Sequence, residues 1–138
     1  YYGDEKNRIY AVTDQISLTQ EDIREVQMAK GAIAAGIELM MEELEITYEQ
    51  VDRVILCGAF GTYMNAKSAA RIGLIPEPLL SKVIAGGNAA GMGCRQITMD
   101  QKLFALTGEL VQKIEPLDLA SRPQFQRTFA KQMAFSEV

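Results

Sequence analysis

The sequence has no histidine, and its two cysteines, Cys57 and Cys94, lie far apart in the chain. Without histidine or a C-x-x-C motif, the usual ligands of a zinc or iron–sulfur site are missing, so we predict no metal site in these residues. Both thiols stand among apolar residues. We therefore expect them to be buried and reduced, as is typical of a cytoplasmic protein.

The sequence also lacks an excess of basic residues and any long apolar run. The sequence contains fourteen Lys and Arg residues and eighteen Asp and Glu residues, which gives a formal net charge of −4. This balance argues against nucleic acid or an anionic membrane as the main partner. No apolar run approaches the roughly 20 residues that cross a bilayer, and no signal peptide opens the chain. The chain does not begin with Met, so we expect it to be a piece of a longer protein.

The pattern that is present is an alternation of strands and helices over residues 1–138, which indicates one α/β domain. We expect a mixed sheet flanked by helices, with one parallel crossover between residues 54 and 83. The expected strands cover residues 8–13, 52–57, 82–87 and 115–120. The expected helices cover residues 19–44, 66–73, 88–97, 99–114 and 122–133, the last with Pro123 in its first turn.

The helix at 19–44 carries the clearest signals. Thr19 is a suitable N-cap and Asp22 completes a capping-box pattern. Apolar residues recur at helical spacing, and we expect this stripe to be buried. It consists of Ile23, Val26, Ile33, Ile37, Met40 and Leu44.

Lys30 falls inside this apolar stripe. A buried ammonium is costly unless it finds a partner or reaches water, so two interpretations stay open. In one, the aliphatic stem covers the core and the ammonium lies in water. In the other, Lys30 is a cation at the rim of a ligand cleft. Gly31 and Gly36 weaken the helix by roughly 1 kcal/mol each, which makes most sense if a backbone or ligand approaches closely.

Two stretches, "VILCGAFGTY" (54–63) and "VIAGGNAAGMG" (83–93), each read as a strand, a glycine-rich turn and a helix. Such turns at the carboxyl ends of strands are typical of ligand sites in α/β sheets. Neither matches a P-loop or a dinucleotide fingerprint. For one loop alone, tight packing of helix on strand is an equal alternative. Two such loops at successive strand ends favour a nucleotide cleft.

At this point a resemblance becomes specific. The stretches "LTQEDIREVQMAKGAIAAGIELMMEE", "VDRVILCGAFGTYMNAKSAARIGLIP" and "VIAGGNAAGMGC", with the ending "LDLASRPQFQRTFAKQMAF", are in the right order over nearly the whole chain. They resemble the C-terminal half of the actin-like (ASKHA, ribonuclease H-like) ATPase domain in reductive activators of corrinoid proteins. Those proteins are ATP-dependent and carry an iron–sulfur cluster.

The resemblance implies a set of nucleotide-binding residues. "LCGAFG" matches the adenosine motif of the actin-like superfamily, which would place Gly58, Ala59, Phe60 and Gly61 against the nucleotide. The second loop would add Gly87 and Asn88. The helix that carries Lys30 would border the adenine and ribose from the other side.

The resemblance also shows what this chain lacks. The N-terminal ferredoxin-like domain that holds a [2Fe–2S] cluster is missing, and "YYGDEKN" does not supply the acidic phosphate hairpin of the superfamily. We therefore assign no catalytic residue. The parent protein would use ATP and Mg²⁺ to return a Co(II) corrinoid protein of a methyltransferase system to Co(I). The 138 residues alone would neither hydrolyse ATP nor reduce a corrinoid.

Two other functions stay open at this stage. One is an ATP-driven electron activator of another enzyme, such as a dehydratase. The other is a non-catalytic docking module whose glycine loops only pack helices. The sequence also leaves open whether the chain forms a homodimer.

Overall fold

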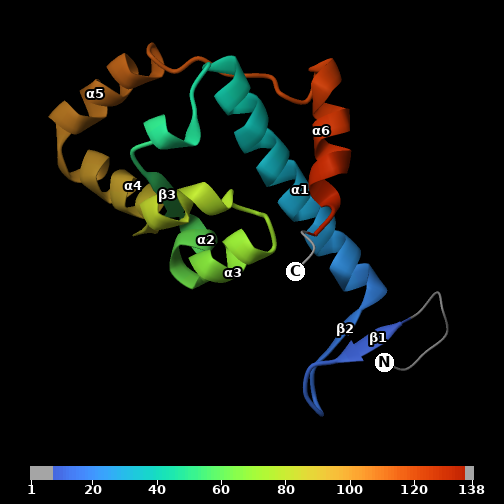
Figure 1. Cartoon of the computed structure of the whole chain (residues 1–138). Coiled ribbons are helices and arrows are strands. Elements are labelled where there is room, and N and C mark those ends of the chain that lie inside the picture. The colour runs from blue at the N-terminus through green and yellow to red at the C-terminus, as the bar shows by residue number, and fades with distance from the viewer. Residues whose placement is uncertain (1–7, 136–138) are drawn as a thin grey trace.

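The long helix α1 (Gln20–Glu43) begins where the sequence predicts and crosses the whole molecule (Figure 1). The structure is a computed structural model, and it describes residues 8–135. The Oγ1 atom of Thr19 accepts a hydrogen bond from the Asp22 amide at 3.1 Å, and Asp22 Oδ2 accepts from the Thr19 amide at 2.8 Å. The predicted capping box is therefore confirmed. The stretch 1–7, in which we expect no phosphate hairpin, lies outside the described residues.

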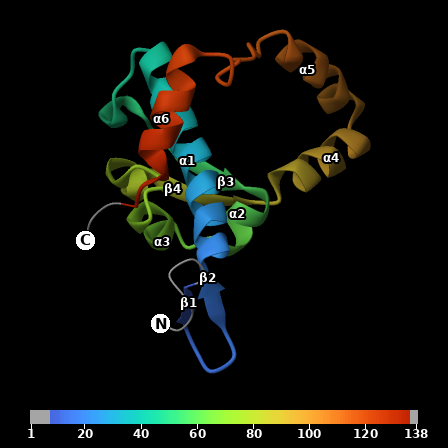
Figure 2. The same cartoon turned by 90° about the vertical axis from the view of Figure 1, so that its right-hand side faces the viewer.

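A β-hairpin precedes α1. Strands β1 (Ile9–Ala11) and β2 (Ser17–Thr19) pair antiparallel, with Tyr10 opposite Leu18. The hairpin projects away from the rest of the molecule at the start of α1 (Figures 1 and 2). The strand expected at 8–13 is thus present in a shorter form. Its partner β2 was not predicted, because three residues with a single large apolar side chain carry no readable period.

The second sheet contains the predicted parallel crossover. Strands β3 (Val54–Cys57) and β4 (Val83–Gly87) pair parallel, and the chain between them forms short helical segments. The α/β class is confirmed, although the described residues form two separate two-stranded sheets and not one mixed sheet. The remaining helical segments are η1 (Tyr48–Gln50), α2 (Gly58–Tyr63), α3 (Ala66–Arg71), η2 (Glu77–Lys82), α4 (Ala89–Met99), α5 (Gln101–Val111) and α6 (Pro123–Met133).

The strand expected at 115–120 is wrong, since this segment carries no strand. Pro116 has no amide to donate to a ladder. Asp118 instead forms a local turn, in which its Oδ1 accepts from the Ser121 amide at 3.2 Å and its Oδ2 from the Ser121 hydroxyl at 2.5 Å. Side-chain hydrogen bonds of this kind compete with a strand for the same backbone groups.

Helix α6 lies along α1 and covers its small residues (Figure 1). The residues of α1 that are buried are Lys30, Gly31, Ala34, Ala35 and Leu39. The expected burial of the large stripe is wrong for three members that are exposed, namely Val26, Met40 and Leu44. Small side chains let two helix backbones approach closely. For this reason α6 packs on the side of α1 that carries the small residues, and not on the side with the large apolar ones.

The core lies between α1, η2 and the inner face of the parallel sheet. Its buried members are Ala69, Leu74, Ile75 and Leu79, with Ile33, Val54, Leu56 and Val83 packed around them. Lys82 fixes one border of this core. Its ammonium donates to the carbonyl oxygens of Tyr48, Glu49 and Val51 at 2.8, 2.9 and 2.6 Å, which holds η1 against η2.

The expected burial of the two cysteines is wrong, because both are free and exposed. Cys57 alternates with Leu56 along β3 and therefore points to the face opposite the core. Cys94 lies on α4, a helix without a buried residue. Apolar neighbours in sequence did not lead to burial here, because both elements leave an apolar side uncovered.

Two glycines of α1 provide a test of the α1–α6 contact. A Cβ at Gly31 would lie 2.9 Å from Met133 Cγ and 3.3 Å from its amide nitrogen, whereas one at Gly36 would meet only Leu119 Cδ1 at 3.8 Å. We expect Gly36→Ala to raise the free energy of unfolding by about 1 kcal/mol through helix propensity. Gly31→Ala should show no such increase in the free energy of unfolding, because Met133 would have to move to make room for the new methyl group. Urea unfolding of both variants checks this, and an equal gain at Gly31 would contradict the close contact.

Candidate functional site

The two glycine-rich loops lie side by side at the carboxyl edge of the parallel sheet. Cys57 of β3 pairs with Gly87 of β4, after a register irregularity between Leu56 and Cys57. Gly58 directly follows Cys57, so it lies next to Gly87 at the same edge. The expectation that the two loops converge at successive strand ends is therefore met by the geometry.

Gly58 and Gly87 share two properties. Their φ angles are +69° and +55°, in the left-handed region that favours glycine. A Cβ built on either would meet no atom within 4 Å. Neither glycine is thus demanded by packing, and each presents bare backbone to open space. An arrangement of this kind allows a flat ligand to lie against the main chain.

Glycine is required at position 61 for a different reason. A Cβ there would lie 2.0 Å from the carbonyl oxygen of Leu56 and 3.1 Å from the amide of Gly87. The backbone of α2 approaches the strands so closely that no other residue fits. Packing of helix on strand, the alternative open at the sequence level, thus accounts for Gly61. The neighbouring Ala59 and Phe60 are exposed, with about half of the Phe60 side chain accessible.

Asn88 shapes the second loop. Its Oδ1 accepts a hydrogen bond from the Gly91 amide at 2.9 Å and caps α4. A Cβ at Gly91 would lie 2.6 Å from Asn88 Nδ2, so Gly91 makes room for this cap. The Asn88 residue is otherwise exposed beside Gly87. Its role in the structure is therefore to fix the exit of the loop from the sheet edge.

The loops carry no charged residue between 57 and 63 or between 83 and 94. Exposed backbone, an amide and an aromatic ring suit a base and a sugar. A phosphate group would need cations or a metal as well. No cluster of three or more potential metal ligands is found among residues 8–135. Within the same residues, no helix is long and apolar enough to span a bilayer.

Lys30 lies in a different environment from the loops. Its residue is 2% exposed, and its ammonium donates to the carbonyl oxygen of Ala134 at 2.6 Å, just beyond α6. The same ammonium lies 5.7 Å from the ring centroid of Phe135. Burial lowers the pKa of Lys30 below its usual value. The ammonium thus has a main-chain carbonyl as its partner, and this carbonyl belongs to the segment after α6 and not to the glycine loops.

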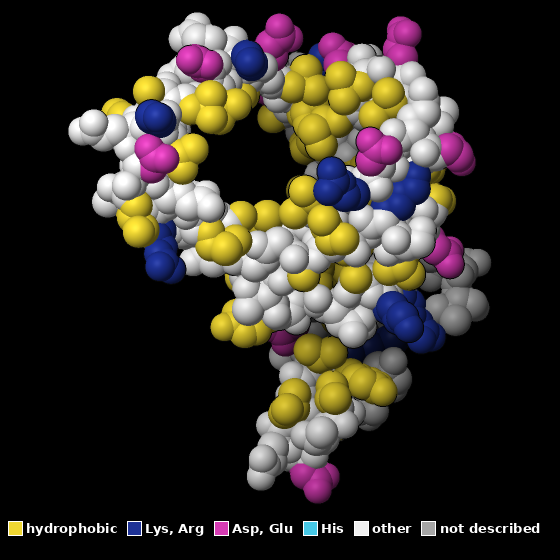
Figure 3. All heavy atoms as spheres, turned by 90° about the vertical axis from the view of Figure 1, so that its left-hand side faces the viewer, with side chains coloured by type: hydrophobic (Ala, Val, Ile, Leu, Met, Phe, Trp, Pro, Cys, Tyr) yellow, Lys and Arg dark blue, Asp and Glu magenta, His cyan; other side chains and the backbone are white. Residues whose placement is uncertain are grey.

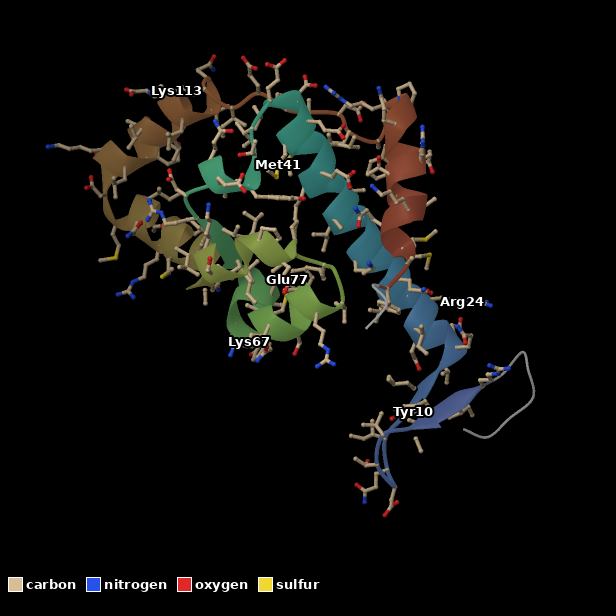
Figure 4. All side chains as sticks on the ribbon, viewed as in Figure 1. Tyr10, Arg24, Met41, Lys67, Glu77 and Lys113 are labelled. Carbon is tan, nitrogen blue, oxygen red and sulfur yellow. The ribbon has the colours of Figure 1, made fainter. Side chains whose placement is uncertain are left out.

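A cavity of about 570 Å³ lies between α1, α3, η2 and α6. Its charged members include Lys67 and Glu77, which Figure 4 labels, and its floor includes the buried Ile75. None of the residues predicted to bind the nucleotide lines this cavity. Sequence patterns could not have found it, because its walls come from residues scattered over five elements, Tyr48 of η1 included.

Residues 4–138 match the family described as the C-terminal domain of RACo, the ASKHA domain. The chain belongs to this family. The match covers far more than half of the sequence, so the predicted membership in the corrinoid activator family is confirmed.

Curated members of this group have consistent names. The chain is 30% identical over 122 residues to the corrinoid activation enzyme RamQ of Eubacterium limosum, which covers 88% of this chain and 21% of that protein. It is 26% identical to the [Co(II) methylated amine-specific corrinoid protein] reductase of Methanosarcina barkeri, covering 87% of this chain and 22% of that protein.

A solved structure confirms the actin-like fold. The reductive activator for corrinoid, iron–sulfur protein superimposes with a TM-score of 0.80 and 33% identity. The match covers 87% of this chain and 19% of that one. The chain therefore spans about a fifth of the length of these relatives.

The buried ammonium of Lys30 gives a pH-dependent prediction. Its folded pKa is lowered, so the unfolded chain binds this proton more tightly. The cost of burying the charge is present at neutral pH and disappears as pH rises toward the unfolded value. We expect the stability of the wild type to rise, relative to Lys30→Met, between neutral pH and the ordinary pKa of lysine. Denaturant unfolding across this range measures it, and a constant difference between the two proteins would contradict the assignment.

Proposed function

We propose that this chain is the nucleotide-binding C-terminal domain of an ATP-dependent reductive activator. The longer protein would return Co(II) corrinoid proteins of methyltransferase systems to the Co(I) state. The observation that supports this most is the pair of open, left-handed glycines, Gly58 and Gly87, side by side at the sheet edge of a chain in this family. The names of the two curated relatives support the corrinoid substrate.

In this proposal the sheet edge binds the adenosine side of ATP. The backbone at Gly58 and Ala59 would lie against the nucleoside, and the half-exposed ring of Phe60 would add apolar surface for the base. Gly61 would hold α2 in place beneath them. Gly87 and Asn88 would form the neighbouring wall of the cleft.

Lys30 takes part in this proposal under one condition. Its ammonium would have to exchange the carbonyl oxygen of Ala134 for a ribose or acidic group of the ligand. That exchange requires the segment after α6 to move, since Lys30 is buried beneath it.

The described residues do not fit Mg²⁺ or a [2Fe–2S] cluster. The loops have no carboxylate, and the two cysteines belong to β3 and α4 without a third ligand nearby. Both groups would therefore be bound by other parts of the longer protein. For this chain we derive no step that passes through them.

The energetic role of the domain follows from linkage. Reduction of Co(II) to Co(I) is uphill for ordinary physiological donors, so a second ligand must shift the equilibrium. A nucleotide can do so only by binding two states of the complex with different affinity. A two-lobed clamp that closes on ATP is a suitable element with two states. This chain would contribute one wall of the clamp. The partner of the longer protein would be a corrinoid protein.

The adenosine assignment predicts the effect of Gly58→Val. The added side chain would fill the space in front of the loop and weaken adenosine and ATP binding by at least about tenfold. Gly73→Val is a matched control, because Gly73 also has a positive φ of +77° but follows α3. Both variants place Val at a positive φ. Titration calorimetry with adenosine, ATP and inorganic triphosphate measures the effect.

Two calorimetric results would count against the assignment. If Gly58→Val bound adenosine as tightly as Gly73→Val, the loop would not contact the nucleoside. If the wild-type chain bound triphosphate but not adenosine, the sheet edge would be a phosphate site. The absence of heat with every ligand would favour the docking module.

We further expect the isolated 138 residues to release no phosphate from ATP and to convert no Co(II) corrinoid to Co(I). The reason is the lack of phosphate-stabilising and redox groups in the chain. Phosphate-release assays and visible absorbance of a corrinoid protein with a supplied reductant test this. ATP-dependent turnover in either assay would show that catalytic groups have been overlooked.

A further inference from the structure

The cavity between α1, η1, α3, η2 and α6 is separate from the glycine loops, and the proposed nucleotide site does not use it. Its volume of about 570 Å³ falls in the range of sites that bind small organic molecules. Its described lining residues belong to elements that pack on the core of this chain. The cavity therefore exists without any segment of a longer protein.

Hydrogen bonds hold the walls of this cavity in place. Gly73, with a φ of +77°, follows α3, and its amide donates to the carbonyl oxygen of Ala70 at 2.9 Å. The next amide, that of Leu74, donates to the carbonyl oxygen of Ala69 at 2.9 Å. These two bonds form a Schellman motif, which ends α3 and directs the chain toward η2. Lys82 then holds η2 against η1. The cavity is thus a fixed part of the fold.

The floor of the cavity is apolar. Ala34 of α1 and Ile75 are 5% and 2% exposed, so the cavity reaches down to the core. Leu80 of η2 and Ala70 of α3 also line it, and both are partly buried. A hydrocarbon group in the cavity would therefore lie on apolar side chains that the fold already holds in position.

Two cations without a partner line the same cavity. Lys67 and Arg71 are four residues apart on α3, so both side chains leave the helix on one face. Neither side chain forms an ion pair or a hydrogen bond with any of residues 8–135. An anion in the cavity would be the first partner of both.

The two carboxylates of the lining differ in their environment. Glu38 of α1 already accepts from Gln132 at 2.5 Å and from Lys131 at 3.5 Å, both on α6. Glu77 of η2, which Figure 4 labels, has no such partner among residues 8–135. The unpaired charges of the described lining are thus two positive and one negative. Their sum is one positive charge, which a single negative charge would balance.

We infer that this cavity binds a small carboxylate with an apolar body. The carboxylate would accept hydrogen bonds from Lys67 and from the guanidinium of Arg71, whose paired N–H groups match carboxylate geometry. The apolar body would lie over Ile75 and Leu80. A phosphate ester fits less well, because it carries nearly two negative charges at neutral pH and would repel Glu77.

Any test must separate this cavity from a second hollow. Figure 3 shows an opening rimmed largely by hydrophobic side chains. Helices α4 and α5 form one side of this opening (Figure 2), and neither helix has a buried residue. Apolar compounds would adhere there as well. A ligand for the cavity must therefore need both its charge and its apolar body, and the binding position must be observed directly.

The first experiment is a nuclear magnetic resonance titration of the ¹⁵N-labelled 138-residue chain with hexanoate. Separate titrations with 1-hexanol and with inorganic phosphate test the apolar body and the charge alone. We expect saturable shifts of the amide signals of residues 67–80 with hexanoate. Hexanol and phosphate should each bind there at least about threefold more weakly.

Substitutions provide matched controls. Lys67→Gln and Arg71→Gln should each raise the dissociation constant for hexanoate by at least about threefold. Lys102→Gln of α5 and Arg95→Gln of α4 remove the same charge at exposed positions outside the cavity, and they should leave the constant unchanged. Ala70→Leu keeps the charge and should weaken binding by filling the cavity. Circular dichroism checks that each variant keeps its helix content.

Several results would overturn the inference. Equal affinity for hexanol and hexanoate would show that the cations take no part, and tighter binding of phosphate would indicate a site for inorganic anions. Shifts confined to α4, α5 and the uncovered sheet face would locate the ligand in the second hollow, and equal weakening by Lys102→Gln would indicate a general effect of charge. Binding that calorimetry detects in the 138-residue chain but not in the longer protein would mean that another segment occupies the cavity.

Discussion

The parallel pairing of β3 with β4 is the constraint on which the rest of the structure depends. It brings into register two segments that are 29 positions apart at Val54 and Val83 and 30 positions apart at Cys57 and Gly87. One face of the pair supports the core, and its carboxyl edge holds both glycine loops. The irregularity after Leu56 lets the chain leave the strand at Gly58 with a positive φ. The backbone hydrogen bonds between β3 and β4 therefore position both the core and the candidate site.

Much of this architecture could be predicted from sequence because the signals were local. The capping box at the start of α1 and the glycine-terminated strands each reside within a few residues, and both were confirmed, whereas the predicted apolar stripe gave the helix correctly but not its buried face. The failures involve partners distant in sequence. The choice between the large and the small face of α1 depends on α6, and no local pattern contains that information. The strand expected at 115–120 failed because turn chemistry at Asp118 was a stronger local signal.

In the candidate site, too, local sequence predicted some features, whereas others depend on residues distant in sequence. Local pattern identified the glycines but not their separate causes, since only coordinates show that Gly61 faces the Leu56 carbonyl while Gly58 faces open space. Likewise, the position of Lys30 in an apolar stripe predicted that its ammonium must either find a partner or reach water. It could not reveal that the partner is the carbonyl of Ala134, which lies 104 positions later. The exposure of Cys57 and Cys94 depends on which layers cover β3 and α4, and this too is a property of the assembled fold.

The position of α6 has a consequence for how the protein folds as it is made. The hydrogen-bonded pairs between α1 and the C-terminal segment are 79 to 104 positions apart, so α1 leaves the ribosome long before the residues that bury it. At ordinary rates of synthesis the delay is roughly 5 to 20 s. During that time the small face of α1 and the Lys30 ammonium are accessible to water and to chaperones. Helix α6 thus completes the burial of α1 only after the whole stretch between them has been made.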